Sequence, residues 1–317
     1  MATVGCAGIL VADMFCGPMS ALPEPGQLLT VDDMPTSVGG CAANVAIDVA
    51  RQGIDVEVAG CLGHDAAAEQ VVSSLRHAGV GCDHIARVNR APTSKTVILL
   101  VAGQDRRYIH SIGANGVFCA TDIHPHWACG LKALYLGGLF AMPGMVADEL
   151  ATLLETCRRA GVLTIGDVVV PSGFRDAGVL VRLLPHFVYF LPNDDEARVF
   201  TGASDPLDQI AALQARGANT VIVTCGPRGS FAGDKRRRWR AGAHRCDAID
   251  PSGSGDAFAA GVITGIVHGW DLPRTLTYGS ALGASAVRSV GTTESVFRSG
   301  QAEAFIAANP IGVEEVP

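Results

Sequence analysis

Apolar runs alternate with helical runs through the middle of this sequence, and this alternation limits the fold more than any other feature. The predicted strands are Ala133–Leu136, Leu163–Val170, Phe187–Leu191 and Thr220–Thr224. The predicted helices are Met145–Ala160, Val179–Leu184, one that starts after Asn193, and Leu207–Arg216. Strands and helices in this order predict an α/β fold with a doubly wound, mainly parallel sheet flanked by helices.

The beginning of the chain follows the same rhythm. Val4–Ala12 is predicted to be a strand that ends at Asp13, and Asp55–Gly60 a second core strand. The helical patterns Ala42–Gln52 and Ala66–Ala78 are each closed by a glycine, the residue that most often ends a helix.

Two segments with a β pattern interrupt the alternation. Met14–Val38 is rich in proline and glycine and includes a predicted strand near Gln27–Val31. Thr93–Ile112 contains a hairpin-like pair, Ser94–Ala102 and Arg106–Ile112, around the turn Gly103-Gln104-Asp105. We expect residues 14–38 and 93–112 to form a small β lid over the carboxyl edge of the sheet.

Length and composition describe a globular enzyme. The 317 residues suit one large α/β domain or two modest ones; no linker or repeat divides them, so we interpret residues 1–317 as a single domain. Met1–Leu10 is apolar but lacks the positive start of a signal peptide, and no run is long enough to cross a membrane. Ten scattered cysteines without a Cys-x-x-Cys pair favour reduced thiols. We therefore expect a cytoplasmic protein.

The charge balance argues against nucleic acid as a partner. The chain has 24 Lys+Arg and 31 Asp+Glu, a net charge of −7, whereas nucleic-acid binding relies on positive charge. The basic run Lys235-Arg236-Arg237-Arg238 lies at the tip of a predicted hairpin, Ser230–Asp247. We interpret this run as a solvated turn.

The stretch Asp250–Gly261 predicts a strand-to-helix turn that ends a strand at Ala248-Ile249 and begins a helix reaching about His268. Its glycines permit unusual backbone geometry, and its N–H groups point to one place at the start of the helix, where an anion would bind. Asp256 stands in this turn. A carboxylate there fits either a base that takes a proton from a substrate hydroxyl or a simple helix cap.

Two polar motifs in the first part of the chain allow both a functional and a structural interpretation. Gly39-Gly40 and Asn44 can bring the backbone close to a small polar ligand, or they can simply start a helix. Asp13 can accept hydrogen bonds from sugar hydroxyls beyond the carboxyl end of its strand, or it can cap a turn.

Three later motifs likewise allow both a functional and a structural interpretation. Asn193 and Glu196 fit a capping box, or oxygen groups that reach Mg²⁺ through water. Thr224–Gly229 fits a phosphate contact or a tight turn. Gly291–Ser295 fits the wall of a bound ion or an ordinary loop. The chain has neither the Gly-Lys-[Ser/Thr] of a Walker A loop nor a Rossmann Gly-x-Gly-x-x-Gly after its first strand, which argues against an NAD-dependent dehydrogenase.

The order of these motifs resembles the ribokinase (PfkB) family of carbohydrate kinases. Gly-Gly-x-Ala-Ala-Asn comes early, then Pro-Asn-x-x-Glu, Thr-x-Gly-x-x-Gly and finally Asp-x-x-Gly-x-Gly-Asp-Ala-Phe. The resemblance spans nearly the whole chain, and the last motif is the most specific. It implies a central, mainly parallel sheet between helices, a β lid, and phosphorylation of a sugar-like hydroxyl with ATP and Mg²⁺.

The resemblance also implies residue roles. Asp256 matches the catalytic base, and Gly253, Ser254 and Gly255 match the anion hole. The positions that match nucleotide contacts are Asn193, Thr224, Gly226, Gly229 and Ser280, with Glu196 near Mg²⁺. The positions that match the sugar site are Asp13, Gly39, Gly40 and Asn44. The positions that match the monovalent-cation (K⁺) loop are Asp250, Ser252, Ala286, Ser289, Gly291 and Ser295.

Two positions depart from the family pattern. Ser254 replaces a more common alanine, a minor change because the backbone N–H does the work. Gly138 falls about where ribokinase carries a substrate-binding glutamate, which argues against ribose itself.

The resemblance leaves two other functions open. These are a nucleoside kinase of the same fold and a catalytically silent sugar- or nucleotide-binding regulator; the intact Gly253–Asp256 turn speaks against the regulator. The apolar lid strands Gln27–Val31 and Thr96–Val101 further predict a homodimer joined through the lid, with residues near Asp33 and Lys95 close to the substrate mouth.

Overall fold

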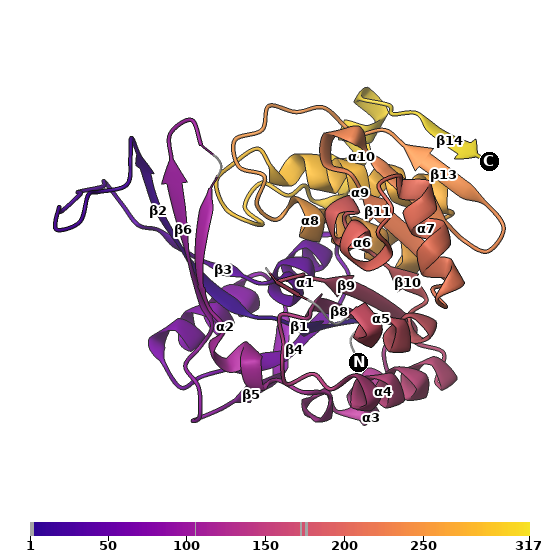
Figure 1. Cartoon of the computed structure of the whole chain (residues 1–317), viewed down its shortest axis with the longest axis horizontal. Helices are drawn as coiled ribbons and strands as arrows, with labels where there is room; N and C mark the ends of the chain where they lie inside the picture. The colour runs from indigo at the N-terminus through magenta and orange to yellow at the C-terminus, as the bar shows by residue number, and fades with distance from the viewer. Residues whose placement is uncertain (1–2, 105, 172, 175–176) are drawn as a thin grey trace.

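The computed structural model describes residues 3–104, 106–171, 173–174 and 177–317, which form one large sheet, one small sheet and the surrounding helices (Figure 1). The large sheet has the strand order β14-β13-β12-β11-β10-β9-β8-β1-β4-β5. Strands β5 to β11 in this order pair in parallel, and β12, β13 and β14 add an antiparallel edge. The predicted α/β class with a mainly parallel sheet is therefore confirmed.

Most strands of the large sheet coincide with apolar runs in the sequence; the exceptions, among them β5 and β14, are described below. Their bounds are β1 Val4–Gly8, β4 Val56–Leu62, β5 Gly81–Arg87, β8 Ala133–Leu139, β9 Leu163–Val168, β10 Tyr189–Phe190, β11 Thr220–Thr224, β12 Ser230–Gly233, β13 Arg238–Ala241 and β14 Val313–Val316. β1, β8 and most of β11 are buried, as expected for parallel strands that helices cover on both faces.

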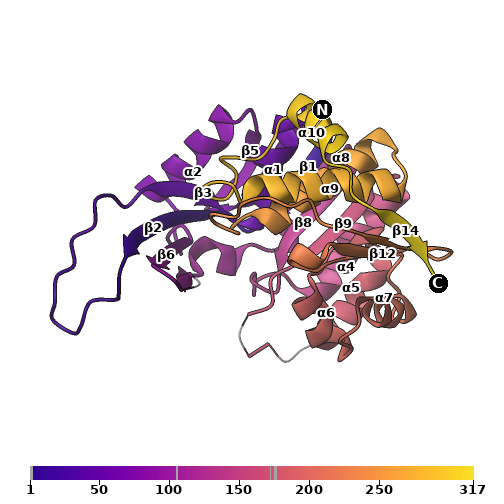
Figure 2. The ribbon, with the colours of Figure 1, turned by 90° about the horizontal axis from the view of Figure 1, so that it is seen from above.

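Helices cover both faces of the large sheet (Figure 2). One layer consists of α1 Cys41–Arg51, α2 Ala66–His77, α8 Ser254–His268, α9 Leu272–Ala286 and α10 Ser299–Ala308. The other layer consists of α3 Pro125–Ala128, α4 Ala147–Arg159, α5 Ala177–Leu183, α6 Asp194–Thr201 and α7 Pro206–Ala215. Each layer packs its apolar face on the sheet, so the core consists of two main apolar clusters, one on each side.

The small sheet comes from the two segments that interrupt the alternation. Its order is β3-β2-β6-β7, with β2 Val11–Met19, β3 Thr36–Gly39, β6 Lys95–Val101 and β7 Arg107–Ser111. β6 and β7 form the predicted antiparallel hairpin; Asp105 of its turn lies outside the described residues. The predicted strand at Gln27–Val31 is wrong, because this stretch is an exposed loop and the neighbour of β2 is Thr36–Gly39.

The predicted strand Val4–Ala12 contains the whole of one strand and the beginning of another. β1 stops at Gly8 and β2 starts at Val11, and the chain crosses from the large sheet to the small one between them. The buried Asn115 bonds both polar groups of Leu10: Leu10 N donates to Asn115 Oδ1 (3.1 Å) and Asn115 Nδ2 donates to Leu10 O (3.0 Å). Asp13 consequently lies within β2, not beyond the carboxyl end of a core strand.

Three further differences concern short or polar segments. β5 and β14 were not predicted, because β5 carries polar residues at several positions and β14 is a short, largely exposed edge strand. Ala248-Ile249 is not a strand end. Ile249 is 66% exposed, and its N–H donates to Val287 O (2.7 Å) in the turn after α9.

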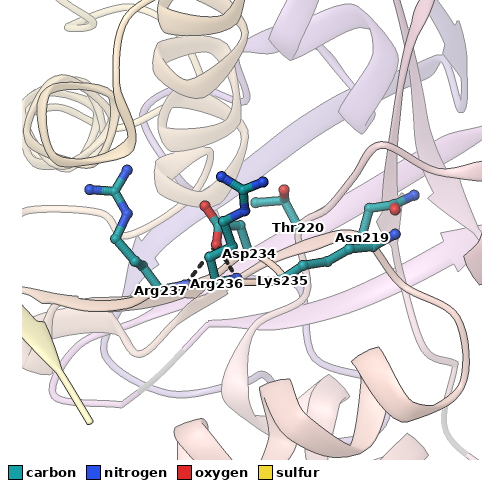
Figure 3. A pocket seen from close by; sticks show the side chains of 6 residues that line it. All are labelled: Asn219, Thr220, Asp234, Lys235, Arg236 and Arg237. Carbon is teal, nitrogen blue, oxygen red and sulfur yellow. Dashed lines mark hydrogen bonds between the residues drawn. The ribbon is translucent and has the colours of Figure 1, made fainter.

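The basic run forms the turn between β12 and β13. Asp234 Oδ1 accepts from the N–H groups of Arg236 (2.7 Å) and Arg237 (2.8 Å), which fixes a tight, exposed turn. A cavity of about 680 Å³ lies beside it, at the start of β11 (Figure 3). This is the opposite end of β11 from Thr224, so the cavity is separate from the predicted site. In the described part of the chain, no helix is long and apolar enough to span a membrane.

Candidate active site

The start of α8 has the geometry of an anion-binding turn. Gly253 precedes the helix in the left-handed region (φ 73°), and a side chain there would collide with the carbonyl oxygen of Thr292. Gly255 is exposed, and a side chain there would meet open space. The N-terminal N–H groups of a helix carry partial positive charge and attract anions.

The predicted base Asp256 lies in the first turn of α8 and contacts the predicted sugar-site residue Asn44. Asn44 Nδ2 donates to Asp256 Oδ2 (2.8 Å), and Asn44 Oδ1 accepts from Thr292 Oγ1 (3.0 Å). The hydroxyl of Thr292 therefore orients the amide so that its NH₂ group faces Asp256. Burial raises the pKa of Asp256, while hydrogen bonds from Asn44 and Cys41 lower it.

Asp13 lies close to the same carboxylate. Burial raises the pKa of Asp13 to about 6; a hydrogen bond from Thr96 lowers it, and the negative charges of Asp256 and Glu294 raise it. A side chain at Gly39 would collide with the Asp13 carboxylate, and one at Gly40 (φ 92°) with the Ile9 carbonyl. The two glycines thus let this segment pack directly against Asp13 and the end of β1.

Asn193 and Glu196 form a capping box at the start of α6. Asn193 Oδ1 accepts from Glu196 N (2.8 Å), and Glu196 Oε2 accepts from Asn193 N (3.0 Å). Burial raises the pKa of Glu196 to about 7; the bond from Asn193 lowers it, and Asp195 and Asp256 raise it. The two hydrogen bonds form the capping box that the structural interpretation of this motif expects. A cavity of about 410 Å³ lies beside the same residues, so the cap also borders an open space.

Thr224 ends β11 next to Asn193. The two residues form an isolated parallel β-bridge, and Thr224 N donates to Pro192 O (3.1 Å). Gly226 is exposed, whereas Gly229 (φ 92°) is buried, and a side chain at Gly229 would collide with the Ala241 carbonyl. Ser280 lies in α9, where its Oγ accepts from His244 N (3.1 Å).

Two of the predicted cation residues, Ser252 and Gly291, contact the carboxylate of Asp250. Its Oδ1 accepts from Ser252 N (2.9 Å) and Ser252 Oγ (2.8 Å), and its Oδ2 accepts from Gly291 N (3.2 Å). Ser295 Oγ donates to Ala286 O (2.9 Å), and Ser289 lies in the turn after α9. The structure adds a partner that the sequence did not predict: Arg106 Nη1 lies 2.6 Å from Asp250 Oδ1.

Sequence analysis also missed three residues near the predicted base. Tyr135 is fully buried in β8, and its hydroxyl donates to Asp167 Oδ2 (2.6 Å) at the end of β9. Burial raises the pKa of Asp167 well above its usual range, as do the charges of Glu196 and Asp256. The thiol of Cys41 bonds with Asp256. Asp167 gave no signal in the sequence, because it lies within the predicted strand Leu163–Val170 and not after its end.

A mainly parallel sheet with a glycine-containing helix start and a nearby carboxylate fits the class of phosphotransferases that use an alcohol group as acceptor. The sequence model described as pfkB family carbohydrate kinase matches residues 1–298. The chain belongs to the pfkB family of carbohydrate kinases.

Individual relatives agree with this family. The chain is 29% identical over 257 residues to the fructoselysine 6-kinase of Shigella flexneri (80% of this chain, 90% of the relative). It is 24% identical over 278 residues to the ribokinase of Haemophilus influenzae (86% and 88%). The structure of Arabidopsis thaliana ribokinase complexed with ribose and ATP matches with a TM-score of 0.83 at 22% identity, covering 96% of this chain and 98% of that one. The ribokinase-like fold is confirmed.

Proposed function

We propose that this chain is an ATP-dependent kinase that transfers the γ-phosphate to a hydroxyl of a sugar or sugar-like molecule, with Asp256 as the base. The observation that carries the proposal is the position of Asp256 in the first turn of α8, beside Gly253, Ser254 and Gly255. A carboxylate there can accept the hydroxyl proton while the helix N–H groups bind the transferring phosphate.

The chain offers a place for each substrate. ATP extends from the α8 start toward Asn193, Thr224, Gly226, Gly229 and Ser280. The sugar binds between Asp13, Gly39, Gly40 and Asn44, and the carboxylate of Asp13 accepts hydrogen bonds from its hydroxyls. Asn44 contacts Asp256 (2.8 Å), so it holds the base in place while the substrate hydroxyl approaches. The lid excludes water that would otherwise accept the phosphate.

The donor set near Glu196 fits Mg²⁺ bound through water. One oxygen, Oε2, accepts the N–H of Asn193, which fixes the carboxylate and leaves Oε1 to accept from a water molecule. Bound Mg²⁺ would supply positive charge that stabilises the transferring phosphate. The pKa of Glu196, raised by burial to about 7, would fall when a cation binds nearby.

The acceptor differs from ribose in this proposal. Gly138 has φ 82°, and a side chain there would collide with Ile9, so no side chain reaches the sugar from this position. Phosphorylation assays across ribose, fructose, fructoselysine, 2-keto-3-deoxygluconate and adenosine test the proposal. Turnover of a sugar supports it, turnover of adenosine alone indicates a nucleoside kinase, and ATP binding without turnover indicates a regulator.

The role of Asp256 has its own test. Asp256→Asn keeps the size of the side chain but cannot accept the proton, so we expect kcat to fall by at least ~10²-fold. ATP binding should stay near normal. Asp247→Asn, in the exposed segment before the same turn, is the matched control and should keep wild-type activity. An Asp256→Asn enzyme with most of its activity would refute the base.

Three further proposals accompany the kinase. The protein forms a homodimer through the exposed apolar face of its lid. It works in the reducing cytoplasm, for which the support is that all ten cysteines are free. A positive charge at Asp250 stabilises the turn that precedes the anion hole, and K⁺ is the ion that the sequence resemblance implies.

A further inference from the structure

Arg106 connects the lid to the turn before the anion hole. It directly precedes β7, and its guanidinium contacts the carboxylate of Asp250, 144 residues away in the sequence. The Nη1–Oδ1 distance is 2.6 Å, and the two side chains are 18% and 4% exposed. A buried carboxylate that lacks a compensating charge destabilises its surroundings. The Arg106 guanidinium supplies that charge.

Asp250 in turn holds together the segments that shape the anion hole. It accepts from Ser252 on one side and from the N–H of Gly291 on the other. Ser252 immediately precedes Gly253, and Gly253 packs directly against Thr292, next to Gly291. The geometry of the first α8 N–H groups therefore depends on the Asp250 carboxylate staying in place.

The lid fixes the orientation of Arg106. Its Nε donates to the hydroxyl of Tyr108, and its guanidinium lies 5.7 Å from the centre of the Tyr108 ring. The neighbouring strand β6 contributes Thr96, which bonds with Asp13 in the predicted sugar site. The same small sheet thus contacts the sugar site through Thr96 and the anion-hole turn through Arg106.

We infer that Arg106 is a positioning residue that acts as a tethered cation for Asp250. With the lid in place, the Arg106 guanidinium contacts the carboxylate oxygen that a free monovalent cation would bind. This contact orders the turn before Gly253–Asp256. The inference rests on the proposed kinase function. It also departs from what the match to a K⁺ loop implies: the wild-type enzyme does not need K⁺, because Arg106 carries the positive charge.

The test compares cation dependence in Arg106→Gln, Arg106→Lys and wild type, at constant ionic strength in lithium or potassium chloride. Without K⁺, Arg106→Gln should lose about tenfold or more in kcat, as when a buried carboxylate loses a charged partner. K⁺ or added guanidinium chloride should restore most of that loss. Arg106→Lys should keep its activity in both salts, and the wild type should change by less than about twofold.

Arg107→Gln is the matched control. Arg107 is the next residue in the chain and is exposed. It donates to the side chain of Gln104 (2.6 Å) and not to Asp250. Its variant should behave like the wild type in both salts. Thermal unfolding gives a readout that needs no turnover: K⁺ should raise the Tm of Arg106→Gln relative to Li⁺, with no such difference in the wild type.

Two results would overturn the inference. One is a wild-type enzyme that K⁺ stimulates strongly, which would show that the guanidinium does not replace the ion. The other is an Arg106→Gln enzyme whose activity and Tm are the same in both salts and which guanidinium does not rescue. Failure of the proposed function would give a different result, namely a wild-type protein that phosphorylates no acceptor in either salt.

Discussion

At the scale of single residues, two opposing effects set the basicity of Asp256. Burial raises its pKa, and hydrogen bonds from Asn44 and Cys41 lower it. The Cys41 thiol keeps its proton at neutral pH, because burial and the nearby charge of Asp256 raise its own pKa well above the usual range. Cys41 is therefore a hydrogen-bond donor that favours the ionised form of the base.

Exchange of Cys41 should change the pH dependence of the enzyme. In the proposed mechanism the ionised form of Asp256 is the active one, so activity should fall as the pH decreases through its pKa. Cys41→Ala removes one donor to the ionised form, so the pKa of Asp256 should rise. The acidic limb of kcat/KM should then move to higher pH.

Cys41→Ser is the control, because its hydroxyl also donates; its acidic limb should stay near that of the wild type. An unchanged or lower acidic limb in Cys41→Ala would show that the thiol does not influence the base.

The sequence predicted the residues of this site unevenly. Asp256 and Asn44 were found because each lies in a glycine-containing motif, and the structure brings them into contact. Arg106 was missed because its partner Asp250 is 144 residues away, and a lone arginine in a hairpin gives no local signal. Cys41 was missed because a cysteine at a helix start is usually a small apolar residue.

At the scale of elements, α1 contains an unusual buried charge. Asp48 is fully buried, and in the described part of the chain neither of its carboxylate oxygens has a hydrogen-bond partner. It is covered because α1 packs against residues 293–297: Arg51 Nη1 donates to Thr293 O, and Gln52 Nε2 donates to Phe297 O (2.9 Å). Burial raises the pKa of Asp48 well above its usual range, although the charge of Arg51 lowers it.

Removal of Asp48 should stabilise the protein at neutral and alkaline pH. A raised pKa in the folded state means that folding favours the protonated acid. Stability is thus lost as the pH rises from the ordinary pKa of aspartate toward the raised value. Asp48→Ala removes the charge and favours the helix, so its Tm at pH 8 should exceed that of the wild type by about 2 °C or more.

This gain should shrink as the pH falls through 4, because the Asp48 carboxyl then becomes protonated in the unfolded state as well as in the folded state. Thermal unfolding across this pH range makes the measurement, with the exposed Asp83→Asn as a control without such a trend. A Tm gain that does not depend on pH, or a loss at pH 8, would contradict this interpretation.

Element prediction succeeded where the hydrophobic pattern alone determines the structure. The buried strand Thr220–Thr224 and the end of the helix at His268 agree with the structure. The pattern failed at Val4–Ala12, because apolar residues continue across the break between β1 and β2. That break depends on hydrogen bonds between Leu10 and Asn115, 105 residues apart, and no local pattern records them.

At the scale of the whole molecule, one face of the small sheet, the proposed lid, is apolar and only partly covered. Met14, Val97 and Ile109 lie side by side on neighbouring strands. They are partly or fully exposed, and Ile109 is 63% exposed. The alternate residues Phe15 and Ile98 are buried on the opposite face. An exposed apolar sheet face of this kind favours contact with a second protein surface.

The last prediction is that this face joins two copies of the chain. A twofold dimer buries the same patch of each copy, so one apolar face is sufficient for a closed assembly. Charge introduced on this face, as in Val97→Lys combined with Leu99→Lys, should dissociate the dimer in sedimentation experiments at micromolar concentration. Thr96 of the same strand bonds with Asp13, so loss of the dimer should also weaken sugar binding more than ATP binding.

Val181→Lys provides the matched control for the lid variant. Val181 is 40% exposed but lies in α5, away from the lid, so its variant should remain a dimer with normal sugar affinity. The rival explanation is that the lid covers only its own core. A wild-type protein that sediments as a monomer at micromolar concentration would favour this rival, as would a lid variant that remains a dimer.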